Sequence, residues 1–155
     1  SLRLGFVLAP RGLVSACERI WEAWLSGAPT VTQAVVADFM DEGLFATHIR
    51  TMRQLYRERH DALIEAAASL SGRIDVQPTA SGFHAVGLLA DDLTEDEVVS
   101  RVRADGVVIS PLGRYVLSSL AQKGVVLGFG SAGVEEIRKG IAVIRKIVSP
   151  KVRLD

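Results

Sequence analysis

The clearest pattern of apolar positions lies near the C-terminus. Val134, Ile137, Ile141, Ile144 and Val148 recur at alternating steps of three and four residues. This spacing is typical of a helix that buries one face against a core. The pattern predicts a final helix over residues 134–148.

A second periodic stretch, residues 47–70, predicts one long helix that crosses a domain or joins two. Its apolar face consists of Ile49, Met52, Leu55, Tyr56, Leu63, Ala67 and Leu70. Arg50, Arg53 and Arg57 share another face because they are three and four residues apart. Without interleaved aromatic side chains and a basic domain, these arginines favour a solvated or subunit-facing edge over a nucleic-acid surface.

The N-terminal part predicts one strand and two helices. Residues 2–8 are an apolar run stopped by a proline and read as a buried strand, whose partner strands we expect in chain outside this sequence. Residues 13–25 and 31–41 read as helices, the second ended by Gly43. Arg3 lies within the apolar run, so it either binds an anion or reaches solvent at the strand end.

After Gly72 the pattern changes to short strands that alternate with helices. A capping box at Thr94 and Glu97 opens a helix that ends at Ala104. Predicted strands cover residues 74–77, 83–89, 107–110 and 125–129, and residues 111–124 form an irregular link. The fold class is therefore α/β, with an α+β C-terminal part in which helices pack on one face of a small sheet.

Composition narrows the class of protein. The 155 residues are 48% apolar and 23% charged, with zero net charge, which is ordinary for a globular chain and excludes a disordered one. No apolar run is long enough to span a membrane. The zero net charge argues against a nucleic-acid binder in its own right.

A single cysteine forms no internal disulfide and fits a reducing compartment. The missing initiator methionine and the apolar excess lead us to expect a fragment.

Candidate chemistry is sparse. The histidines have no cysteine or carboxylate partners at ligand spacing, so no metal site is expected. The glycine-rich segment 128–133 favours a strand-to-helix turn over an anion site. Arg114 and Tyr115 lie in the irregular link, where ligand-binding residues concentrate, although an arginine on a surface loop is also common.

Several motifs together resemble a known family. Residues 1–10 resemble the segment that follows the pyridoxal phosphate lysine in fold-type-I aminotransferases. Further positions are similar to the MocR-type subgroup of GntR transcriptional regulators: residues 32–34, 39–40, 43, 48–53, 56, 59, 81–84, 107–115 and 125–130. Their order and spacing cover essentially the whole chain.

The resemblance implies an architecture for a longer, cytoplasmic parent protein. A winged helix-turn-helix module, absent here, would bind DNA. An aminotransferase-like domain would bind pyridoxal 5'-phosphate and sense a small amino effector or the cofactor itself. Residues 1–46 would be a remnant of its large cofactor-binding subdomain, and residues 47–155 the long linking helix and the small subdomain. We expect a homodimer that does not associate with membranes.

The resemblance also assigns residues. Arg3 would hold the cofactor phosphate. Arg114 and Tyr115 are the residues that we expect to contact the effector, because of their position in the irregular link. The Schiff-base lysine would lie upstream of Ser1, so we expect neither covalent cofactor binding nor catalysis by this chain. Val126 occupies the position of the arginine that binds the substrate carboxylate in aminotransferases. This replacement weakens the alternative of a C-terminal piece of a class I aminotransferase and favours a sensor whose ligand is the cofactor or a compound without that carboxylate. A third reading is a free-standing α/β interaction domain without cofactor.

Overall fold

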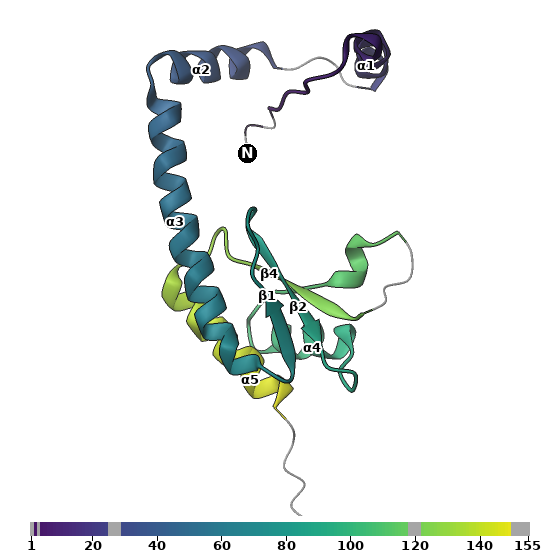
Figure 1. Ribbon diagram of the computed structural model, residues 1–155, viewed down its shortest axis with the longest axis vertical. Coiled ribbons are helices and arrows are strands. Elements are labelled where there is room, and N and C mark those ends of the chain that lie inside the picture. The colour runs from purple at the N-terminus through teal and green to yellow at the C-terminus, as the bar shows by residue number, and fades with distance from the viewer. Residues whose placement is uncertain (1, 3, 25–28, 118–121, 150–155) are drawn as a thin grey trace, which may run out of the picture. The chain divides into compact units, whose positions relative to one another are not determined.

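The computed structural model describes residues 2, 4–24, 29–117 and 122–149. They belong to two compact units, Ser1–Thr51 and Met52–Asp155. Figure 1 shows the helices and strands of each unit along the chain. The long helix α3, Leu44–Ala67, begins in the first unit and ends in the second, where the short 3-10 helix η1, Ala68–Leu70, continues it. The long helix predicted over residues 47–70 is confirmed, with a start three residues earlier.

The second unit is built on a four-stranded antiparallel sheet of order β1-β2-β4-β3 (Figure 1). The strands are β1 Ile74–Gln77, β2 His84–Leu89, β3 Ser110–Pro111 and β4 Gly124–Gly128. Val126 of β4 lies opposite Val86 of β2 and, on its other side, opposite Ser110 of β3. Because partners in register share a face, these three residues point to the same side of the sheet.

The core lies on the other side of the sheet. Alternate strand residues such as Ile74, Ala85 and Leu127 are buried there together with α4, Glu95–Ala104, and α5, Val134–Val148. Apart from the buried Gly124, the intervening residues of the same strands are half-buried or exposed. This alternation is that of a sheet covered by helices on one face. The predicted α/β fold class, with a small sheet and helices on one face, is confirmed.

The two C-terminal helices form where the sequence indicates them. Ile137, Ile141, Ile144 and Val148 of α5 are buried as the periodicity predicts. At the start of α4 the Thr94 hydroxyl accepts a hydrogen bond from the Glu97 amide at 3.4 Å. The Glu97 carboxylate does not complete the predicted capping box in the bonds the structure shows, since it accepts from Arg101 one turn later.

Arg73 ties three parts of the second unit together. Its Nε donates to the Val148 carbonyl at 2.8 Å, and its two Nη atoms donate to the Asp92 carboxylate at 2.9 Å. The hydrogen bond from Arg73 is the main cause of a lowered pKa of Asp92. A lowered folded-state pKa means that this contact stabilises the fold above the ordinary carboxyl pKa and is lost as the pH falls through the lowered value.

Two predicted strands differ from the structure. Residues 2 and 4–8 form no strand, and Phe6, Val7 and Leu8 are each more than 80% exposed. A strand requires paired backbone groups, and the described residues of the first unit include no partner strand. The strand predicted over residues 107–110 is reduced to β3, because the Val107 amide donates to Val102 at the end of α4 and is not available to the sheet.

The first unit consists of helices. They are α1, Arg11–Trp24, α2, Thr30–Asp41, and the first turns of α3. Gly43 follows α2 with a φ of 73°, a conformation that glycine adopts without strain. The Phe39 ring contacts Phe45 and His48 edge-on. None of the described residues of this unit is buried, so it has no core of its own in the described chain. None of the described helices is both long and apolar enough to cross a membrane.

Candidate functional site

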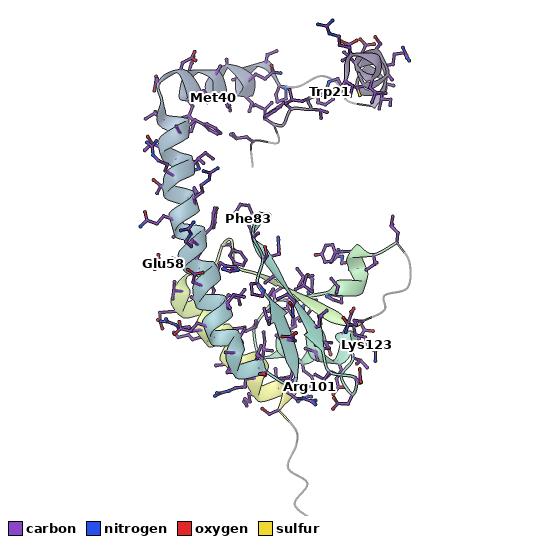
Figure 2. The ribbon with its side chains drawn as sticks, viewed as in Figure 1. Trp21, Met40, Glu58, Phe83, Arg101 and Lys123 are labelled. Atoms are coloured by element: carbon purple, nitrogen blue, oxygen red, sulfur yellow. The ribbon has the colours of Figure 1, made fainter. Side chains whose placement is uncertain are left out.

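A cavity of about 620 Å³ lies in the second unit between α3 and the loop that joins β1 to β2. Arg53, Tyr56, Arg57 and His60 of α3 line one side, and residues 79–83 with Phe129 line the other. Figure 2 shows Phe83 at the end of the β1–β2 hairpin, beside α3. The helical residues are three or four positions apart, so a single face of α3 supplies all of them.

An aromatic pair joins the two walls of this cavity. The rings of Tyr56 and Phe83 have centroids 4.4 Å apart and are tilted by 55°. The Arg59 guanidinium lies 5.8 Å from the Tyr56 ring centre and donates a hydrogen bond to the Gly130 carbonyl. Gly130 leaves room for Phe83, since a Cβ there would lie 3.0 Å from the Phe83 Cβ. The Phe83 ring is therefore packed between Tyr56 and the backbone at Gly130.

His60 is a structural bridge between the helix and the loop. The Thr79 amide donates to His60 Nε2 at 3.3 Å, and His60 Nδ1 lies 3.1 Å from the Asp61 carboxylate. These partners assign the proton of the neutral ring to Nδ1, which donates to Asp61. Both ring nitrogens are occupied, so His60 positions the loop and is not free to act as a base.

Arg53 and Arg57 differ from the other charged residues around the cavity. Both are exposed, and no ion pair or hydrogen bond engages either side chain among the described residues. Arg50, one turn before, donates instead to the Thr47 hydroxyl at 3.1 Å. The spacing predicts one edge for all three arginines, and in the structure only Arg53 and Arg57 line the cavity.

The predicted effector residues lie elsewhere in the second unit. Arg114 and Tyr115 belong to the short 3-10 helix η2, Leu112–Tyr115, and both are exposed. Neither lines the cavity beside α3. The Glu95 carboxylate anchors their loop, because it accepts from the Gly113 amide at 3.0 Å and from the Gly124 amide at 2.7 Å. One side chain thus holds both ends of the segment that carries Arg114 and Tyr115.

Replacing Glu95 by alanine should release both ends of this loop. The exposed Gly113 amide and the buried Gly124 amide both lose a charged acceptor, which costs about 1–3 kcal/mol of unfolding free energy. We expect the Gly113 and Gly124 amides to exchange with solvent faster in the variant, as measured by hydrogen exchange. Asp96→Ala is the matched control, since Asp96 is exposed in the same first helical turn. Equal exchange rates in the two variants would contradict the anchoring role.

The other residues assigned from the sequence are placed as follows. Val126 is half-buried on the sheet face opposite the core. Arg3 lies outside the described residues. Of the lysines, Lys123, Lys139 and Lys146 are described, and none lines the cavity beside α3. Within the described part of the chain, no three His, Cys, Asp or Glu side chains gather closely enough to hold a metal ion.

This chain matches one protein family and several related proteins. The family described as aminotransferase class I and II matches residues 1–123. The probable rhizopine catabolism regulatory protein MocR of Rhizobium meliloti is 34% identical over 147 residues, which are 94% of this chain and 30% of that protein. The uncharacterized HTH-type transcriptional regulator YhdI of Bacillus subtilis is 28% identical over 98% of this chain and 33% of its own length. The arginine–pyruvate transaminase AruH of Pseudomonas aeruginosa is 26% identical over 91% of this chain and 32% of its own length.

Solved structures show the same fold. An archaeal alanine:glyoxylate aminotransferase superimposes with a TM-score of 0.87 at 18% identity, over 97% of this chain and 38% of that one. The α-aminoadipate aminotransferase LysN of Thermus thermophilus, solved with N-(5'-phosphopyridoxyl)-L-leucine, gives a TM-score of 0.80 at 20% identity, over 92% of this chain and 36% of LysN. The chain thus spans about a third of the length of the proteins that it matches.

Proposed function

Because the chain belongs to the class I and II aminotransferase family, we propose that it is the C-terminal portion of the effector-sensing domain of a MocR-type GntR transcriptional regulator. The regulators MocR and YhdI confirm the resemblance to this subgroup that the motifs indicate. The family implies pyridoxal 5'-phosphate as the cofactor of the whole protein.

The observation that carries this proposal is the similarity to MocR across nearly the whole chain. A second candidate function is that of a class I aminotransferase piece, which the similarity to the transaminase AruH supports. Val126 weighs against the enzyme. It is half-buried between Val86 and Ser110, and an apolar side chain cannot form the bidentate pair with which an arginine holds a carboxylate. The effector of the proposed sensor is therefore the cofactor itself or an amino compound that needs no carboxylate clamp at this position.

The proposal assigns roles to three residues. Arg3 binds the cofactor phosphate, for which a planar guanidinium is well suited. Arg114 and Tyr115 contact the effector from the loop that Glu95 anchors. The cofactor, when bound, supplies an aldehyde that reacts with amino groups. We assign its covalent attachment to a lysine upstream of Ser1, because residues 1–10 resemble the segment that follows this lysine in aminotransferases.

The proposal extends to the partners of the whole protein. Its DNA contacts belong to a winged-helix module outside this chain, and it acts in the cytoplasm as a homodimer. The exposed apolar side chains of the first unit support a larger assembly, since Phe6, Val7 and Leu8 have nothing to bury them among the described residues. We propose that the large subdomain covers them.

The coding sequence upstream of Ser1 tests the proposal most directly. We expect it to encode a winged helix-turn-helix and a linker, and the full-length protein to bind a specific DNA fragment in a mobility-shift assay. An aminotransferase N-terminus without a DNA-binding module, together with transaminase activity, would establish the second candidate instead.

A further inference from the structure

We propose that the cavity beside α3 binds a small molecule that joins an aromatic ring to an anionic group, either a carboxylate or a phosphate. This inference goes beyond the proposed function, which assigns no role to the cavity or to its arginines. It holds for a regulator and for an enzyme alike.

The charges of the cavity favour an anion. Arg53 and Arg57 are one helical turn apart and both line the cavity, yet neither has an acidic partner among the described residues. Asp61 is the one carboxylate in the described lining, and it already accepts from His60 Nδ1. The two guanidinium groups can bind a carboxylate or a phosphate with paired hydrogen bonds.

The aromatic side chains favour a flat apolar group next to that anion. Phe83 lines the cavity and is 47% exposed although its ring lies against Tyr56. Phe129, which also lines the cavity, is 2% exposed. A ligand ring that covers Phe83 removes apolar surface from water, and aromatic contact adds about 0.5–1.5 kcal/mol.

The walls of the cavity are held in place without a ligand. The Phe129 amide donates to the Phe83 carbonyl at 2.9 Å, which extends the β2–β4 pairing to the cavity. The Ser81 amide donates to the Thr79 hydroxyl at 3.2 Å, and Gly82 turns the chain with a φ of 88°. A pre-formed site loses little conformational freedom on binding. The volume of about 620 Å³ is that of a small-molecule pocket.

Binding of simple probes to the cofactor-loaded, full-length protein tests this proposal. The probes are benzoate, phenyl phosphate and the neutral benzamide, and calorimetry measures their affinities while the cofactor absorbance shows that its site stays filled. We expect benzoate or phenyl phosphate to bind at least tenfold more tightly than benzamide. The preferred anion identifies the head group as carboxylate or phosphate.

Variants locate the binding. The double variant Arg53→Gln/Arg57→Gln should weaken the preferred probe at least tenfold, whereas Arg103→Gln, which removes an exposed arginine of α4, should leave its affinity unchanged. Phe83→Ala should weaken the aromatic probe but not inorganic phosphate. Three results would overturn the proposal. The double variant could bind the probe as tightly as the wild type, benzamide could bind as tightly as the anionic probes, or none of the probes could bind. DNA binding is measured on the same samples, so failure of the proposed regulatory function is recognised separately.

Discussion

Replacing Arg3 by glutamine in the full-length protein is expected to weaken the binding of pyridoxal 5'-phosphate by about 10- to 100-fold. Hydrogen bonds to a charged group contribute about 1.5–3 kcal/mol, and each 1.4 kcal/mol corresponds to a factor of ten in affinity. Glutamine keeps a hydrogen-bond donor of reduced reach but loses the charge and the second parallel bond. Titration of the apo protein with the cofactor, followed by its absorbance, measures the change.

Two further variants make this result specific to the phosphate contact. Arg11→Gln removes an exposed arginine at the start of α1, only eight residues away, and should leave the affinity unchanged. Arg3→Lys retains the charge without the planar fork and should recover part of the affinity. If Arg3→Gln binds the cofactor as tightly as the wild type, the assignment of Arg3 to the phosphate is wrong.

Ile144→Ala should lower the free energy of unfolding of this chain by about 2–5 kcal/mol. Ile144 is 2% exposed and lies on α5 within the core that α5 shares with the sheet, so alanine leaves a cavity in the centre of the second unit. Both the lost burial and the cavity destabilise the fold. Urea unfolding followed by circular dichroism measures the change in midpoint.

The same substitution on an exposed helical face is the control. Ile20 of α1 is 63% exposed, and Ile20→Ala should change the unfolding free energy by less than about 0.5 kcal/mol. A midpoint shift of equal size in the two variants would show that the core of the second unit does not determine the stability of the chain.

The C-terminal helices were predictable from the sequence because each has its own pattern of apolar or capping residues. The stripe of Ile137, Ile141 and Ile144 defines α5, and Thr94 defines the start of α4. The strand predicted over residues 2–8 was wrong for this chain, because an apolar run only favours a strand and the described residues of the first unit supply no partner strand. The predicted boundary between residues 46 and 47 stays a prediction about the subdomains of the whole protein, whereas the compact units divide after Thr51.

The cavity beside α3 could not be read from spacing alone. Its walls come from α3, the β1–β2 loop and Phe129, and they meet only when the sheet has formed against the helix. The sequence showed the helical spacing of Arg53 and Arg57, but it did not show that neither has an acidic partner among the described residues. The signal for the cavity that the sequence did offer was Phe83, which follows the turn at Gly82. A large apolar side chain is unusual at an exposed turn. Arg114 and Tyr115 were placed correctly in an exposed loop, and their contact with an effector stays a prediction.

The two hydrogen bonds of Glu95 affect how this protein tolerates insertions and deletions between Gly113 and Gly124. Since one carboxylate binds the amides of Gly113 and Gly124, the two ends of the intervening segment keep their separation whatever its length. Doubling the length of such a loop costs only about 0.6 kcal/mol of closure entropy. The segment can therefore gain or lose residues, and with them the side chains that it carries, while the register of β3 and β4 is preserved.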